Sequence, residues 1–126
     1  MQASARLFLA LGAVAMLAAV VLGAFGAHAL KVRIRPELLV TYHTAVEYHV
    51  YHALGLLAVG IVALHLPDSA WLRASGWLMA AGIVLFSGSL YLLATTGVRA
   101  LGAITPFGGA LFILAWALFA VAVLKR

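Results

Sequence analysis

Ionisable, hydroxyl and aromatic side chains gather in one stretch of an otherwise apolar chain. At about 100° per residue, a helix through this stretch places seven residues on one face: Thr41, Thr44, Glu47, Tyr48, Tyr51, His52 and Gly55. Ionisable groups are costly at membrane depth, where by default they mark function. We therefore take Glu47, Tyr48 and His52 as the first candidates for chemistry.

Two residues outside this stretch are expected to join them. His28 follows the first apolar segment, and Ser87 lies within the third. If they converge with Glu47, Tyr48 and His52 inside the protein, the five residues form a polar and hydrated cluster. The alternative is that Glu47 lies at the membrane interface. There it would reach lipid headgroups or pair with a nearby basic residue, Arg33 or Arg35.

Five histidines raise the question of a metal or haem site, while the absence of cysteine excludes thiolate ligands. Metal sites need three or four converging ligands, and haem needs an axial histidine in a broad apolar pocket. His49 and His52 are three residues apart, but His49 points away from the polar face, and no spacing is diagnostic. We expect no metal and no cofactor, with histidine-based cofactor binding as a lesser alternative. His65 is expected to interact with the carbonyls that end its helix.

Composition identifies lipid as the solvent for most of the chain. Of its 126 residues, 67% are hydrophobic and 9% are charged, whereas soluble domains are about half apolar and about a quarter charged. The net charge of +5 resides mainly at the ends of apolar segments, where basic groups anchor to headgroups. We therefore expect a lipid bilayer, and no nucleic acid, as the environment and partner.

Four segments are long and apolar enough to cross a bilayer, at about 20 residues for each crossing. They span residues 7–30, 38–66, 71–96 and 106–124. The short connections predict an all-α, antiparallel bundle of four transmembrane helices, with residues 1–126 forming a single domain. The first segment also resembles a cleavable signal peptide, but it is long for one, so we expect a retained helix.

Helix-end signals and anchoring residues agree with these segments. Pro36 and Glu37 suit the start of the second helix, and Ser69 offers a cap for the third. Basic and tryptophan side chains are expected at the interface: Lys31, Arg33, Arg35, Trp71, Arg73 and Arg99. Small residues four apart, from Ala15 through Ala19 and Gly23 to Ala27, predict close packing of the first helix.

Orientation in the membrane is not decided by the distribution of lysine and arginine. The side with both termini carries Arg6, Arg73, Lys125 and Arg126, and the other carries Lys31, Arg33, Arg35 and Arg99. Basic residues favour the cytoplasmic side, so four against four gives no preference, and only the N-terminal amine favours termini inside. Residues 97–109, rich in glycine, fit either an interfacial loop or a partly re-entrant segment.

Four stretches carry a resemblance to a known family. They are Leu22–Leu30, Thr44–Leu54, Leu85–Tyr91 and Leu101–Gly109. In this order, they resemble the YgdD-like family of small membrane proteins, domain-of-unknown-function family 423. The resemblance implies a multi-pass protein of the bacterial inner membrane and brings no known reaction or ligand. The family's glutamine in place of His43 or His49 makes those two histidines weak ligand candidates.

Three functions remain open at this point. The first, which we favour, is a non-enzymatic scaffold or accessory subunit, working as a homo-oligomer or within a larger membrane complex. The second is a small oligomeric transporter or channel that uses the polar cluster, and the third is cofactor binding. An enzyme is not expected, because a nucleophile such as Ser87 would need a base and an orienting acid beside it.

Overall fold

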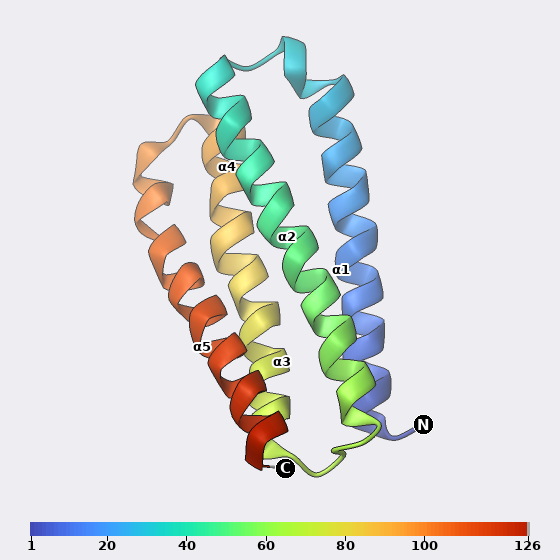
Figure 1. Cartoon of the computed structure of the whole chain (residues 1–126). Coiled ribbons are helices and arrows are strands. Elements are labelled where there is room, and N and C mark those ends of the chain that lie inside the picture. The colour runs from blue at the N-terminus through green and yellow to red at the C-terminus, as the bar shows by residue number, and fades with distance from the viewer. Residues whose placement is uncertain (126) are drawn as a thin grey trace.

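The computed structural model describes residues 1–125, which form helices joined by short connections. The elements are α1 (Ala3–His28), the 3₁₀ turn η1 (Leu30–Val32), α2 (Pro36–Ala63), α3 (Ala70–Gly82), the π-helical turn η2 (Ile83–Ser87), α4 (Gly88–Thr96), the 3₁₀ turn η3 (Arg99–Ala103) and α5 (Thr105–Lys125). Four helical spans are long and apolar enough to cross a membrane, since α3, η2 and α4 together make one of them. Both ends of the chain lie at the same end of the bundle (Figure 1). The predicted all-α architecture of four membrane-spanning helices is confirmed.

The helix α2 connects the two halves of the bundle. It pairs along its length with α1, and α3 pairs with α5, while α2 also packs against α3, η2 and α4. In Figure 1, α1 and α5 lie on opposite sides of the molecule, with α2 and the α3–α4 rod between them. One long face of α2 is therefore left uncovered by the other helices.

Two helices begin at the residues predicted to start or cap them, and one helix ends earlier than predicted. Pro36 begins α2, and the Ser69 hydroxyl accepts a hydrogen bond from the Leu72 amide at 3.2 Å at the start of α3. The second helix ends at Ala63, three residues before the predicted boundary. Its last turn is closed by the Leu66 amide, which donates to the Val62 carbonyl.

The glycine-rich connection before α5 is a short surface turn. Gly97 ends α4 with a φ of +74°, a left-handed conformation that costs glycine least. Val98, Arg99 and Ala100 are exposed, and α5 has already begun at Thr105. Of the two readings of residues 97–109, the structure favours the surface connection.

Small residues bring α1 and α2 together at a different spacing from the predicted one. The buried small residues of α1 recur every seven positions: Ala5, Gly12, Ala19 and Gly26. A Cβ atom at Gly12 would lie 2.9 Å from the backbone nitrogen of Leu57. Because helices in lipid associate through close packing, glycine permits this approach. Ala27, predicted to face a neighbour, is exposed, because a seven-residue repeat follows a left-handed helix crossing and a strict four-residue spacing does not.

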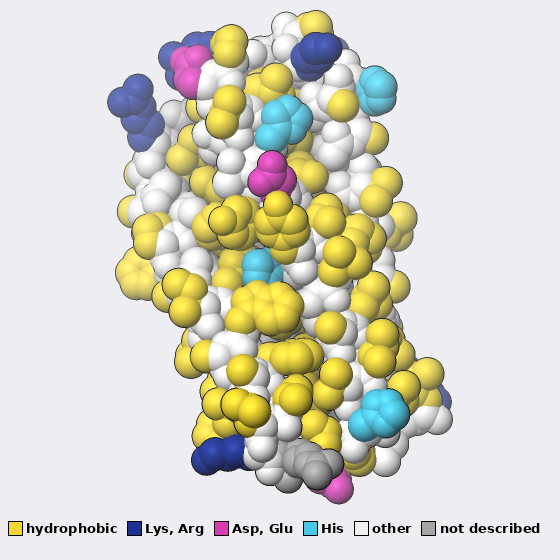
Figure 2. Space-filling view, in the orientation of Figure 1, with side chains coloured by type: hydrophobic (Ala, Val, Ile, Leu, Met, Phe, Trp, Pro, Cys, Tyr) yellow, Lys and Arg dark blue, Asp and Glu magenta, His cyan; other side chains and the backbone are white. Residues whose placement is uncertain are grey.

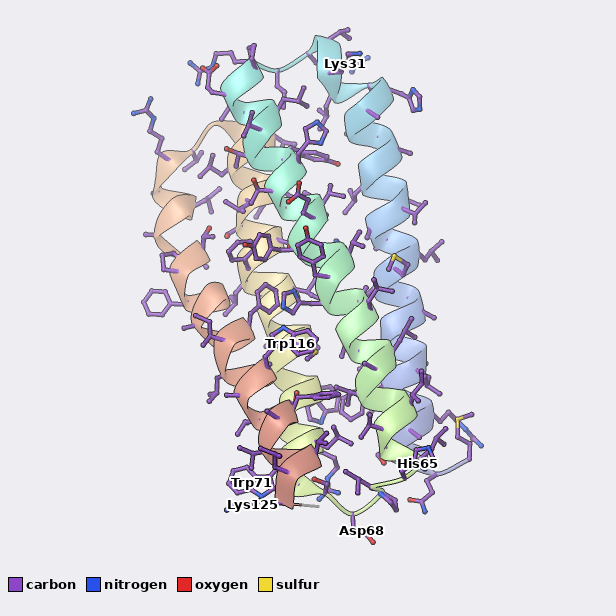
Figure 3. The ribbon with its side chains drawn as sticks, in the orientation of Figure 1. Lys31, His65, Asp68, Trp71, Trp116 and Lys125 are labelled. Carbon is purple, nitrogen blue, oxygen red and sulfur yellow. The ribbon has the colours of Figure 1, made fainter. Side chains whose placement is uncertain are left out.

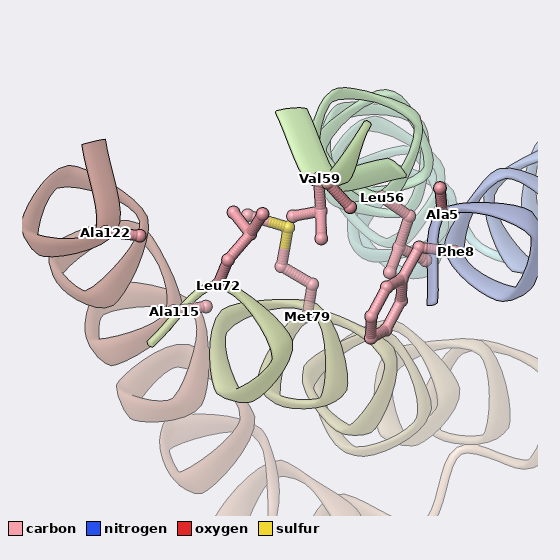
Figure 4. Packing of buried hydrophobic residues seen from close by; sticks show 9 residues of the cluster. Ala5, Phe8, Leu56, Val59, Leu72, Met79, Ala115 and Ala122 are labelled. Atoms are coloured by element: carbon pink, nitrogen blue, oxygen red, sulfur yellow. The ribbon is translucent and has the colours of Figure 1, made fainter. Parts of the chain in front are cut away.

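Large apolar side chains fill the space between α1, α2 and α3. Phe8, Leu56, Val59, Leu72 and Met79 are each at most 1% exposed and pack in one cluster (Figure 4). Small residues of α5, Ala115 and Ala122, complete the same core. This cluster lies toward the end of the bundle that holds both termini, because Ala5, Phe8, Leu72 and Ala122 lie near the ends of their helices.

Hydroxyl groups hold neighbouring helices together by binding backbone carbonyls. Ser75 of α3 donates to Ala115 of α5, and Ser87 of η2 donates to Ala45 of α2, each at 2.7 Å. Tyr42 of α2 donates to Leu22 of α1 at 2.6 Å. Within residues 1–125, no buried side-chain nitrogen or oxygen lacks a hydrogen-bond partner.

The third span is interrupted by a π turn that the sequence did not predict. A continuous helix was expected over residues 71–96, but Ile83–Ser87 adopts the π form, with the Gly88 amide bonded to the Ile83 carbonyl. Single π turns are uncommon and are frequent at functional sites. Here the turn coincides with the Ser87 bond to α2, and its Phe86 backbone packs against Gly108 of α5.

We predict that Gly108→Ala destabilises the protein because the new methyl group would collide with the Phe86 backbone. Overpacking of this kind costs about 1–3 kcal/mol. Gly109→Ala is the matched control, since its Cβ would lie 3.8 Å from the Phe86 ring, an ordinary contact. Unfolding by sodium dodecyl sulfate in detergent micelles measures the difference. Equal stabilities of the two variants would contradict the proposed contact.

Candidate functional site

The five residues of the predicted polar cluster do not converge. Tyr48 and His52 lie on the side of α2 that faces α5, and Ser87 is buried where it bonds to Ala45. His28 is exposed at the end of α1, and Glu47 is exposed on the outward face of α2. Of the expected cluster, His52 and Ser87 are therefore buried, whereas His28, Glu47 and Tyr48 are exposed.

His52 is held by both of its ring nitrogens. Its Nε2 accepts a hydrogen bond from the Trp116 indole at 3.0 Å, so the proton resides on Nδ1. Nδ1 in turn donates to the Tyr48 carbonyl at 2.7 Å. The imidazole also stacks on Phe112 with ring centroids 3.5 Å apart. With both nitrogens engaged and the ring 4% exposed, His52 has no free nitrogen for a metal or haem iron.

Aromatic rings around His52 line a groove between α2, η2 and α5. The groove has a volume of about 480 Å³, and the rings that line it belong to Tyr48, Tyr51, His52, Phe86, Phe112 and Trp116. Figure 3 shows Trp116 at mid-height, between α5 and α2. The Phe86 ring, placed by the π turn, lies 4.7 Å from that of Tyr48. We call this feature the aromatic groove.

A second buried histidine lies one turn before His52 on α2 and bonds to α4. His49 is 5% exposed, and its Nδ1 shares a 2.8 Å hydrogen bond with the Tyr91 hydroxyl of α4. The Tyr91 ring also packs 5.2 Å from that of Tyr42. Sequence reasoning correctly placed His49 off the polar face but missed its role in joining α2 to α4. The spacing of Tyr42, Ala45, His49 and Leu56, one buried side of α2, was the available signal.

Glu47 lies at the centre of the uncovered face of α2. We call this face the outer stripe, formed by Val40, His43, Glu47, Tyr51, Leu54 and Ile61, all of them exposed. Within residues 1–125 the Glu47 carboxylate has no hydrogen bond or ion pair, and the one salt bridge joins Arg35 to Glu37 at 3.3 Å. The suggested pairing of Glu47 with Arg33 or Arg35 is therefore absent. Figure 2 shows acidic and histidine side chains interrupting a largely hydrophobic face.

The position of Glu47 along α2 places it inside the hydrocarbon layer. The middle of α2 falls between residues 49 and 50, about 4 Å from Glu47 at 1.5 Å per residue. A hydrocarbon layer about 30 Å thick, centred on the helix, extends about 15 Å to each side. A charged residue at the centre of a membrane helix costs about 3 kcal/mol on insertion scales. Exposure to lipid is thus an unfavourable environment for this carboxylate.

The residues predicted to anchor the protein to headgroups lie at the two ends of the bundle, and their contact with headgroups stays a prediction. Lysine and arginine side chains gather there in Figure 2, and the predicted anchors are all exposed: Lys31, Arg33, Arg35, Trp71, Arg73 and Arg99. Lys125 lies over the Trp71 ring, 5.8 Å from its centroid (Figure 3). His65 differs from expectation. It lies beyond the end of α2, and its side chain makes no hydrogen bond to the terminal carbonyls within residues 1–125.

Metal-ligating side chains are dispersed over the molecule. Among residues 1–125, no three histidine, aspartate or glutamate side chains come together as metal ligands would. The features of the molecule with distinctive chemistry are therefore the aromatic groove and the Glu47 carboxylate beside it. Glu47 and Tyr51 are four residues apart on α2, and side chains at this spacing are neighbours on a helix.

We predict that His52→Phe lowers the free energy of unfolding by about 1–2 kcal/mol. A phenyl ring can retain the stacking on Phe112, but it leaves the Trp116 N–H without its acceptor. His28→Phe is the control, because His28 is exposed at the end of α1 and should be nearly neutral. Unfolding in mixed micelles measures both variants. A neutral His52→Phe would show that the Trp116–His52 bond does not stabilise the helix pair.

Comparisons with known proteins agree with this architecture. The model of the family described as "Protein of unknown function (DUF423)" matches residues 22–109. The UPF0382 membrane protein YwdK of Bacillus subtilis is 52% identical over 120 residues, which cover 95% of this chain and 98% of that protein. UPF0382 membrane proteins of Staphylococcus epidermidis and Staphylococcus saprophyticus are 46% and 45% identical, each over 95% of this chain and over 97% and 98% of theirs. No solved structure matches the chain. The chain is thus a multi-pass membrane protein that belongs to the DUF423 family, whose function is unknown.

Proposed function

We propose that this protein is a non-enzymatic accessory subunit that binds another membrane-spanning helix along the outer stripe of α2. The observation that carries the proposal is Glu47, a carboxylate that is exposed inside the hydrocarbon layer and unpaired within residues 1–125. A neighbouring helix with a hydrogen-bond donor or a cation at the same depth would satisfy it. Polar groups that bond across helices are a common means of association in lipid.

The shape of the outer stripe supports this role. Val40, Tyr51, Leu54 and Ile61 are each more than half exposed and follow one another along α2. They give a partner helix an apolar contact surface on both sides of Glu47. The face is uncovered because α1 and α5 lie on opposite sides of the molecule and neither extends across it (Figure 1).

Other functions that the sequence left open find less support. Transport through the interior of one chain would need a polar path, yet Glu47 faces outward and the buried hydroxyls are bonded to backbone carbonyls. Cofactor binding would need a free imidazole nitrogen, and His52 uses both of its nitrogens within the protein.

We predict that a photo-crosslinking amino acid at Leu54, which is 52% exposed on the outer stripe, traps a membrane protein in living cells, and that Glu47→Ala weakens the trapping. Loss of one polar contact worth about 1.4 kcal/mol lowers binding about tenfold. The same crosslinker at Val84, which is 69% exposed on another helix, controls for random encounters in lipid. Glu37→Ala, at the rim of the bundle, is the control for loss of charge.

Two results would contradict the proposal. One is equal trapping from Leu54 and Val84, which would mean that the outer stripe contacts only lipid and passing proteins. The other is trapping at Leu54 that is unchanged by Glu47→Ala, which would show that the carboxylate does not take part in binding.

A further inference from the structure

We propose that the partner of the outer stripe is a second copy of this chain, inserted in the membrane in the opposite orientation. This inference rests on the function proposed above, because it names the occupant of the same surface. It combines two independent observations, the balance of basic residues across the membrane and the position of Glu47 along α2.

The balance of basic residues permits both orientations. Arg6, Arg73 and Lys125 lie at the end of the bundle that holds the termini, and Arg126 follows Lys125 in the sequence. The opposite end carries an equal number: Lys31, Arg33, Arg35 and Arg99. Because an excess of lysine and arginine on one side determines which side faces the cytoplasm, this chain has no side-chain signal for a single orientation.

The position of Glu47 makes the outer stripe complementary to its inverted copy. Consider two α2 helices that run antiparallel at the same depth. A residue that lies a given number of positions before the helix middle is then opposite the residue of the second copy that lies the same number of positions after the middle. Glu47 lies two to three residues before the middle, and Tyr51 lies one to two residues after it. The Glu47 carboxylate therefore faces the Tyr51 hydroxyl of the second copy to within about 2 Å along the helix axis.

Two-fold symmetry doubles this contact. Each carboxylate accepts a hydrogen bond from the hydroxyl of the opposite Tyr51, so both copies gain the same bond. A second copy in the same orientation would instead place Glu47 against Glu47, two groups of like charge without a donor between them. The inverted arrangement is the one that satisfies the carboxylate inside the hydrocarbon layer.

Cysteine cross-linking can distinguish the two arrangements, because the natural chain has no cysteine. His43→Cys and Leu54→Cys are made in two copies that carry tags of different size, and the copies are expressed together and oxidised in membranes. An inverted pair brings position 43 of one copy to within about 3 Å, along the helix axis, of position 54 of the other. The same arrangement separates position 43 of one copy from position 43 of the other by about 20 Å along the helix axis. We expect the mixed product between 43 and 54 and little 43–43 product.

A topology experiment tests the same inference independently. Reporters fused after the C-terminus, one active only in the cytoplasm and one only outside it, should both be active with the unchanged chain. Lys31→Gln combined with Arg33→Gln leaves four basic side chains on the terminal side against two on the other. This variant should place the termini inside and abolish the 43–54 product.

The outcomes separate this inference from the proposed function. Activity of one reporter only, or 43–43 and 54–54 products without 43–54, would overturn the inverted pair and leave the outer stripe as an interface. No cross-link between copies, together with Glu47-dependent trapping of a different protein at Leu54, would overturn the second copy alone. Failure of both kinds of cross-linking would overturn both proposals.

Discussion

The structure depends on the requirement that polar groups in lipid find partners within the protein. Water is absent from the hydrocarbon layer, so each polar group without a hydrogen-bond partner there costs several kcal/mol of free energy. The interior meets this requirement: hydroxyls of Ser75 and Ser87 bond to carbonyls of neighbouring helices, and His49 and His52 bond to Tyr91 and Trp116. These bonds also connect α2 to α4 and α5, so the same groups that would be costly alone specify how the helices pack.

Glu47 is the exception to this requirement, because its carboxylate has no hydrogen bond or ion pair within residues 1–125. A carboxylate at the rim of the bundle, such as that of Glu37, pairs with Arg35 and is solvated, and such surface pairs contribute little to stability. Glu47 lies about 15 Å further along the same helix, on a face that no other helix covers. The simplest account is that the folded unit of this protein is larger than one chain, and that the missing donor belongs to a neighbour.

Much of the fold was predictable from the sequence, and the reason for the errors is physical. Span length and apolar composition identified four helices, and Pro36 and Ser69 marked two helix starts, because these signals are local. The faces of the helices were harder to assign, because residues that face lipid and residues that face the core are equally apolar. That is why Ala27 was assigned to a contact it does not make, and why neither the contact of His49 with α4 nor those of Phe112 and Trp116 with α2 were recognised. The π turn at Ile83–Ser87 has no local signal, since it depends on the bond of Ser87 to α2 and on the close approach of Gly108.

Oxygen accessibility of a spin label measures whether the outer stripe of α2 is covered by another helix in the membrane. A nitroxide at Leu54→Cys is compared with one at Val20→Cys on α1, since both residues are more than half exposed in the single chain and lie equally far from the middle of their helices. Oxygen concentrates in lipid, so a covered side chain encounters less of it. We predict clearly lower oxygen accessibility at position 54 than at position 20 in nanodiscs of native lipid. Equal accessibility at the two positions would contradict a covered outer stripe, because α2 would then face lipid as α1 does.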